Sequence, residues 1–346
     1  MGTTAERSSV PIPATAGGWV ELGRTTLGSA GDTITVSSLA DKRYLMVLGS
    51  VNQTGGDWRT FVRLNGDTGS NYSQRYNQNG GADLTNTSLN GMMDWNTTNT
   101  TSTFEIMYFA NYSSKEKLGI KHKVGQSTAG ATTAPIRGEM VGKHVQTSNP
   151  ISSITLTDAV DPKAGSANTG SEVVVLGWDP SDTHTTNFWE ELASVNASGS
   201  STNLSSGTIT AKKYLWIQLH TEGSTNDVDI TFNNDTGSNY AQRWSINGGT
   251  ETTVTSQTQL RHTHQSGVSA TPNAFSNWFI INNASNEKLG VVHNVVSGTA
   301  GAGTAPQRGE FTIKWANTSN QITEIDVDSA VSNFGTNSFL KVWGAD

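Results

Sequence analysis

The chain contains the same domain-sized sequence twice. The segment Asp-Thr-Gly-Ser-Asn-Tyr-Ser-Gln-Arg at residues 67–75 recurs at residues 235–243 with eight of nine positions identical. A second block, residues 111–160, aligns without gaps to residues 282–331 and shares 26 of 50 positions. Solenoid repeats are only roughly 20–45 residues long, so a repeat of this size is a whole domain. The sequence therefore predicts a tandem domain duplication.

The weaker matches around these blocks set the domain boundaries that we expect. The first domain spans residues 19–179 and the second residues 188–346, and residues 180–187 form a short polar linker that contains a proline. So short a linker favours two domains that pack against each other. Residues 1–18 lie outside the repeat, and we expect an extended N-terminal arm that docks onto a neighbouring subunit, with a frayed terminus as the alternative.

The apolar residues of both copies predict β-strands. They alternate with polar residues, as in Ile34/Val36 and Leu118/Ile120, and clusters of Gly, Asn, Ser and Thr separate the runs. The 36 glycines disfavour helices as well. We therefore expect an all-β protein of two tandem homologous antiparallel β-sandwich or jelly-roll-like domains.

The composition excludes several classes of function. The chain has no cysteine, so disulfides, thiolate metal sites and cysteine nucleophiles are excluded. The net charge of −7 is spread without a basic patch, which argues against nucleic acid as a partner. No apolar stretch approaches a membrane-spanning length, so we expect no membrane partner.

The repeated Asp-Thr-Gly-Ser-Asn-Tyr motif has the chemistry of a turn. Aspartate bonds back to the chain, glycine permits positive φ, and Tyr72 or Tyr240 starts the next strand. A cation or sugar site is the alternative, because residues 233–239 concentrate oxygen atoms, but the bidentate acid of an EF-hand loop is missing.

Two pairs of histidines invite functional hypotheses. His122 and His293 occupy equivalent positions, and alternation places each on the apolar face of a strand, which favours hydrogen-bonded core histidines. His262 and His264 share a strand face in the second copy only, and a transition-metal site there is the less favoured alternative.

No pattern typical of an active site is found. Arg137-Gly-Glu139 and Arg308-Gly-Glu310 are expected to form structural ion pairs, each within its own domain. The acidic pairs Glu190/Glu191 and Asp227/Asp229 are interpreted as solvated loop charges. We therefore predict no catalytic, cofactor-binding or metal-binding residue and no cofactor, so the protein is expected not to be an enzyme.

A further set of motifs is found in the second copy: Asn-Asp-Thr-Gly-Ser-Asn-Tyr at 234–240, Glu-Lys-Leu-Gly at 287–290, Thr-Ala-Pro at 304–306, Arg-Gly-Glu at 308–310, Lys314-Trp315, Asn-Thr-Ser at 317–319, Gln321-Ile322 and residues 339–344. With these motifs the chain resembles a family of β-rich virion proteins encoded by tailed phages and marine viral genomes. The resemblance covers both copies, nearly all of residues 19–346, and the second copy fits it better. The first copy departs from these motifs at His144 and Pro150, so its strand there is expected to end earlier or to face a different neighbour.

The resemblance implies a non-enzymatic structural protein of a virion. We expect a capsid decoration (cement) protein or a tail or fibre component, acting through contacts with capsid or tail subunits and forming a homo-oligomer. The alternative is a glycan-binding module for host recognition, with Trp58, Trp95 and Trp244 as candidates for stacking on sugars and a core position as the equal alternative for each of them.

Overall fold

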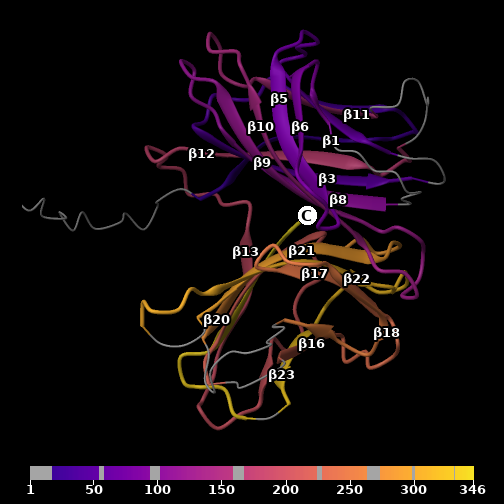
Figure 1. Ribbon diagram of the computed structural model, residues 1–346, viewed down its shortest axis with the longest axis vertical. Helices are drawn as coiled ribbons and strands as arrows, with labels where there is room; N and C mark the ends of the chain where they lie inside the picture. The colour runs from indigo at the N-terminus through magenta and orange to yellow at the C-terminus, as the bar shows by residue number, and fades with distance from the viewer. Residues whose placement is uncertain are drawn as a thin grey trace, which may run out of the picture.

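The computed structural model of the 346-residue chain describes residues 18–53, 58–93, 102–158, 167–223, 228–262, 273–297, 301–330 and 332–346. These residues form 24 β-strands and no helix, so none of them belongs to a membrane-spanning helix. Figure 1 shows two bodies, one above the other, built from the two halves of the chain. Residues 1–17 of the predicted arm (residues 1–18) lie outside the described residues, as do the gaps between the ranges above.

The first half of the chain forms an eight-stranded and a four-stranded antiparallel sheet. The eight-stranded sheet has the order β1-β12-β3-β8-β9-β10-β5-β6, and the four-stranded sheet the order β2-β11-β4-β7. The strands are β1 (Val20–Thr26), β2 (Thr33–Ser37), β3 (Tyr44–Asn52), β4 (Thr60–Leu64), β5 (Tyr72–Gln78), β6 (Leu84–Leu89), β7 (Met92–Met93), β8 (Ser102–Ala110), β9 (Lys117–Gly125), β10 (Ile136–His144), β11 (Ser153–Asp158) and β12 (Glu172–Trp178).

The second half repeats this arrangement. Its sheets have the orders β13-β24-β15-β20-β21-β22-β17-β18 and β14-β23-β16-β19. The strands are β13 (Glu190–Asn196), β14 (Asn203–Ser205), β15 (Tyr214–Thr221), β16 (Val228–Phe232), β17 (Tyr240–Ile246), β18 (Thr252–Gln257), β19 (Leu260–Arg261), β20 (Ala274–Ile281), β21 (Lys288–Val296), β22 (Gln307–Trp315), β23 (Ile325–Ser329) and β24 (Phe339–Ala345).

The two halves have the same topology, strand for strand. Adding twelve to each strand number of the first half gives the order of the second half in both sheets. The repeated Asp-Thr-Gly-Ser-Asn motif immediately precedes β5 in one half and β17 in the other. The prediction of an all-β protein made of two tandem homologous antiparallel sandwiches is confirmed.

Each sandwich encloses its own apolar core between the large and the small sheet. In β2, alternation turns Ile34 and Val36 inward and leaves Thr33, Thr35 and Ser37 exposed. The corresponding core of the second half contains Trp278 and Trp315. Burial of such side chains is the main favourable contribution to folding.

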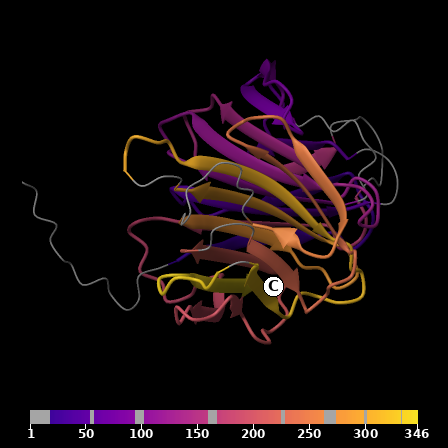
Figure 2. The same cartoon turned by 60° about the horizontal axis from the view of Figure 1, so that its bottom comes forward.

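A third apolar layer joins the two large sheets through their outer faces. Met46, Leu48, Phe104, Ile106, Val124, Val174 and Leu176 of the first half are buried there with Trp189, Tyr214, Phe279, Ile281, Leu289, Val291 and Ala345 of the second. Figure 2 shows the strands of the two large sheets stacked over each other. The two sandwiches therefore pack against each other, as the short connection between them led us to expect.

Candidate functional site

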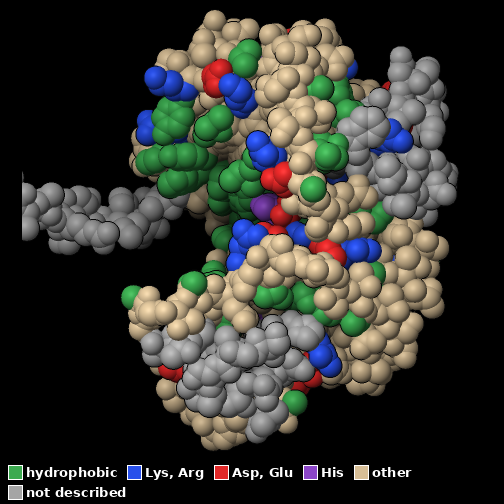
Figure 3. All heavy atoms as spheres, in the orientation of Figure 1, with side chains coloured by type: hydrophobic (Ala, Val, Ile, Leu, Met, Phe, Trp, Pro, Cys, Tyr) green, Lys and Arg blue, Asp and Glu red, His purple; other side chains and the backbone are tan. Residues whose placement is uncertain are grey.

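The two large sheets are closely packed on one side of the interface and open on the other. His122 of β9 and His293 of β21 lie at the boundary between the packed and the open part of the interface, with ring centroids 4.1 Å apart. Beyond them in one direction, Val124 and Val291 are buried together. In the other direction Ile120 and its neighbour Leu118 are exposed, and so is Val295 of the second sheet. Figure 3 shows the resulting hollow between the two bodies, with hydrophobic side chains on its upper wall and a histidine at its inner end.

The upper wall of this hollow is an apolar pocket of about 390 Å³. It is lined by Trp19, Tyr44, Leu45, Tyr108, Phe109, Ala110, Leu118, Ile120 and Trp178. The rings of Tyr44 and Trp178 stack at 5.5 Å. We call this surface, together with the adjoining Val141, the apolar wall. In the second half, the equivalents of Leu118 and Ile120 are Leu289 and Val291, which are buried against the first half. The apolar wall is thus the copy of a surface that is already used for packing.

A charged cluster lies at the inner end of the hollow, with Arg137 at its centre. The guanidinium contacts Glu139 of its own strand, β10. It also contacts Glu310 of β22 at 3.0 Å and donates from Nε to Glu251 at 2.6 Å. Only 4% of the Arg137 side chain is exposed, so one cation holds three largely buried carboxylates together across the interface.

The prediction that Arg137 and Arg308 form structural pairs within their own domains is incomplete for Arg137. Arg308 pairs within its domain, through a 3.2 Å contact with Glu310, and its side chain is 64% exposed. Arg137 pairs with Glu139 of its own strand and, in addition, bridges the two sandwiches. The two equivalent arginines therefore have different environments, because Arg137 is buried in the interface and Arg308 lies at its exposed edge.

His122, His293 and Glu139 form a second group within the cluster. One candidate ligand atom from each lies within 4.8 Å of the other two. Burial lowers the pKa of His122 to about 3, helped by the nearby His293 and Arg137, and burial also lowers the pKa of His293. Burial raises the pKa of Glu139 to about 7 despite Arg137, and the neighbouring Glu310 adds to the rise. Both imidazoles are therefore neutral near pH 7.

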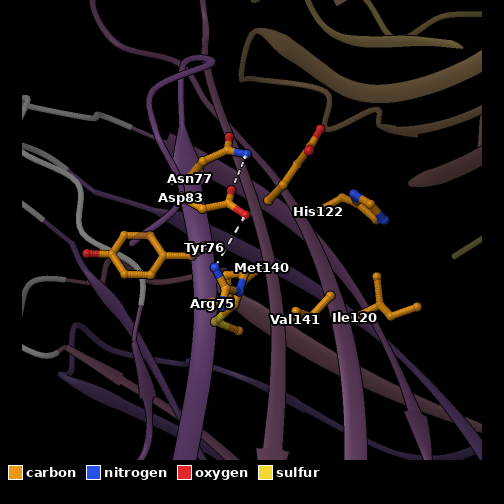
Figure 4. A pocket seen from close by; sticks show the side chains of 9 residues that line it. Arg75, Tyr76, Asn77, Asp83, Ile120, His122, Met140 and Val141 are labelled. Atoms are coloured by element: carbon orange, nitrogen blue, oxygen red, sulfur yellow. Dashed lines mark hydrogen bonds and ion pairs between the residues drawn. The ribbon is translucent and has the colours of Figure 1, made fainter. Parts of the chain in front are cut away.

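The interpretation of His122 as a hydrogen-bonded core histidine is wrong. The alternation correctly placed both rings on an apolar strand face, but that face is the outer one, between the sandwiches. The buried Nδ1 of His122 has no hydrogen-bond partner within the described ranges. Figure 4 shows His122 at the edge of a pocket whose other labelled residues include Arg75, Asp83 and Ile120.

The Asp-Thr-Gly-Ser-Asn-Tyr motif is a turn in both sandwiches. Asp67 accepts hydrogen bonds from the backbone of Gly69 at 2.7 Å and from the side chain of Asn71 at 2.8 Å. Tyr72 uses its buried hydroxyl to accept from the backbone N–H of Leu64 at 3.0 Å. The second copy repeats these bonds around Asp235 and Tyr240. The aspartate carboxylate and the tyrosine hydroxyl of each motif therefore stabilise the turn and the strands next to it.

The aspartate of each turn also holds the ring at the end of the neighbouring strand. Asp67 Oδ2 lies 2.8 Å from Nε2 of His144, and Asp235 Oδ2 accepts from Nε1 of Trp315 at 2.7 Å. The strands β10 and β22 that carry these rings have equal lengths and the same pairing with β5 and β17. The expected early end or different neighbour at His144 is therefore wrong: histidine replaces tryptophan as the partner of the aspartate.

We expect Asp235→Ala to lower the free energy of unfolding by about 1–3 kcal/mol, because it leaves the buried indole N–H of Trp315 without an acceptor. Chemical denaturation measures the loss. Thr236→Ala, which changes a neighbouring exposed turn residue, is the control and is expected to change stability by at most about 0.5 kcal/mol. Equal losses in the two variants would contradict the role assigned to Asp235.

The remaining sequence candidates that the structure describes do not form a site. Trp58 and Trp244 are buried core residues, so of the two alternatives left open for them the core position is the right one and neither stacks on a sugar. Trp95, His264 and Asp227 lie outside the described residues. His262 is fully buried near Trp278, and burial lowers its pKa to about 3. The exposed Glu190 and Glu191 pair with Lys212 and Lys341, and Asp229 accepts from Gln259.

Comparisons with known proteins add little to these observations. No protein-family model and no curated protein matches the chain. Domains LG4–5 of the mouse laminin α1 chain are similar at a TM-score of 0.19 and 10% identity, over 94% of this chain and 88% of that one. The LG1–3 region of the laminin α2 chain is similar at a TM-score of 0.19 and 8% identity, and this chain covers only 64% of its length. Both likenesses are too weak to bear on function.

Proposed function

We propose that the protein is a non-enzymatic structural component of a bacteriophage-like particle, which attaches to other virion proteins through the apolar wall. The observation that carries the proposal is the exposure of Leu118 (57%), Ile120 (49%) and Val141 (51%) beside the aromatic residues of the wall. Contiguous apolar surfaces of this kind typically mark protein–protein contacts. The resemblance of the repeat to virion proteins supplies the class of partner, a capsid or tail subunit.

The equivalent surface of the second half supports this use of the wall. Leu289 and Val291 already bind an apolar protein surface, that of the first sandwich. Leu118 and Ile120 occupy the same strand positions and offer the same kind of contact. A second copy of the chain or a different virion subunit fits this chemistry, and the former gives the homo-oligomer that the sequence led us to expect.

Glycan binding is the second candidate function, because Trp19, Tyr44 and Trp178 place aromatic rings on the wall. Sugars need hydrogen-bonding groups beside the rings that they stack on. The only polar side-chain atoms among the nine residues of the pocket are the tyrosine hydroxyls and the indole nitrogens. This lining favours an apolar protein surface over a glycan.

We expect Ile120→Asp to weaken attachment at least about tenfold, because docking would bury its charge in an apolar contact. Since the side chain is half exposed in the free protein, the melting temperature is expected to stay nearly unchanged. Cosedimentation with particles assembled without this protein measures attachment. Leu84→Asp is the matched control, because Leu84 is 53% exposed on the edge strand β6 and does not line the wall.

The two candidate functions give opposite results in two assays. Loss of particle attachment or self-association in Ile120→Asp, with a blank glycan array, would support the virion proposal. Specific glycan binding by the unaltered protein that Ile120→Asp abolishes would show that the wall is a sugar site. Attachment that neither Ile120→Asp nor Leu118→Asp weakens would overturn the proposed role of the wall.

A further inference from the structure

The interface between the sandwiches brings together three side chains of the types that bind transition metals. His122 and Glu139 come from neighbouring strands of the first sandwich, where they are cross-strand partners of the β9–β10 ladder. His293 comes from β21 of the second sandwich. Their candidate ligand atoms lie within 4.8 Å of one another. Around a tetrahedral zinc ion, ligand atoms are about 3.3 Å apart, so small side-chain rotations would complete the geometry.

We propose that His122, His293 and Glu139 bind a divalent transition-metal ion of the zinc type, which links the two sandwiches. Two imidazoles and one carboxylate form a known zinc ligand set with one open position. The buried Nδ1 of His122 has no partner among the residues that the structure describes, so a metal ion would satisfy a polar atom that the protein leaves unpaired.

The charges around the group are compatible with a dication. Arg137 contacts Oε1 of Glu139, and the same carboxyl group shares a hydrogen bond with Glu310, which a bound ion would replace. Glu251 and Glu310 also contact this arginine, and each lies near a second one, Arg243 at 4.0 Å and Arg308 at 3.2 Å. Three carboxylates and three guanidinium groups therefore lie together, and no positive charge is in excess before an ion binds. The histidines are neutral near pH 7 and need to lose no proton on binding. A bound dication would in turn lower the pKa of Glu139 and keep the carboxylate ionised.

The site has a route to solvent. His122 and Glu139 line the pocket of Figure 4, whose rim includes Arg75, Asn77 and Asp83. The same two residues also line the narrow space shared with His293 and Phe311 at the interface. An ion could therefore enter through the pocket on the first sandwich. It would bind at the inner end of this pocket, where His293 of the second sandwich lies. Metal binding would depend on domain packing, and packing would be strengthened by the metal.

The test uses the full chain without a histidine tag, treated with chelator and then titrated with Zn²⁺. Calorimetry is expected to show one ion per chain, and at a hundredfold excess over the Kd the melting temperature is expected to rise by about 5 °C. His122→Asn and His293→Asn are each expected to weaken binding by at least about 100-fold, since even indirect partners of a ligand change affinity 10–100-fold.

The control variant is His220→Asn, which removes a histidine from the same face of the second large sheet but outside the group. It is expected to bind Zn²⁺ like the unaltered chain. Co²⁺ is a second probe, because its visible spectrum reports ligand geometry even if a variant is less stable. No bound ion per chain, or binding that survives in both His122→Asn and His293→Asn, would overturn the proposal.

Discussion

Replacing Arg137 with alanine is expected to lower the free energy of unfolding by about 3–5 kcal/mol, the cost typical of removing one partner from a buried charge group. Without the guanidinium, Glu139, Glu251 and Glu310 would be left close together in the interface, with only Arg243 at 4.0 Å from Glu251 and the exposed Arg308 beside Glu310. The carboxylates would have to take up protons or draw in water, and both weaken the packing of the two sandwiches. Equilibrium denaturation with urea measures the loss.

Arg308→Ala is the matched control, because the same residue stands at the equivalent position of the second copy. Its side chain is 64% exposed and pairs only with Glu310, so we expect a loss of at most about 1 kcal/mol. The comparison removes the same chemical group from the same strand position and changes only its surroundings. Similar losses for the two variants would show that Arg137 does not hold the interface together.

The different roles of these two arginines show what the repeat could not predict. The repeat predicted two sandwiches of one topology, because equal patterns of alternation specify equal strands and turns. It could not predict which copy of each surface would be buried between them. The apolar wall around Leu118 is exposed, whereas its equivalent around Leu289 is buried. Which of the two surfaces is buried depends on how the two sandwiches pack against each other, and a local sequence pattern does not specify that packing.

Alternation also could not distinguish the core face of a strand from its outer face. In β8, Met107 and Phe109 point into the first core, while Phe104 and Ile106 point to the second sandwich. A strand that is apolar on both faces is buried on both. The apolar residues at successive positions of β8 were therefore the sequence feature that could have indicated a layer between the domains. The same ambiguity led to the prediction that His122 lies in the core, and it left open whether Trp58 is a core or a surface residue.

The second large effect is expected inside the first sandwich, where Lys121 and Glu105 form a buried ion pair. Lys121 Nζ lies 2.6 Å from Glu105 Oε2, and both side chains are almost fully buried. Lys121→Val removes the cation and leaves the carboxylate without it, so we expect the free energy of unfolding to fall by about 3–5 kcal/mol. Thermal and urea denaturation at pH 7 measure the change.

The second sandwich shows how the same space is filled without this ion pair. The positions of Glu105, Met107 and Lys121 are taken there by Ser276, Trp278 and Val292. Trp278 lies opposite Val292 across the β20–β21 ladder and donates from its indole nitrogen to Ser276 at 2.7 Å. The indole ring of Trp278, which is larger than the Met107 side chain, and one neutral hydrogen bond thus replace the two charged groups.

The triple variant Glu105→Ser, Met107→Trp, Lys121→Val transfers that arrangement into the first sandwich. Because it removes both charges and fills the volume that they leave, we expect it to recover at least half of the stability lost in Lys121→Val. The stability of the double variant Glu105→Ser, Lys121→Val is expected to lie between those of Lys121→Val and the triple variant, since the double variant removes the carboxylate that lost its cation but leaves a cavity beside Met107. A triple variant as unstable as Lys121→Val would contradict this prediction. It would show that the ion pair depends on neighbouring residues that differ between the two sandwiches, so that a group of core residues cannot be exchanged between them.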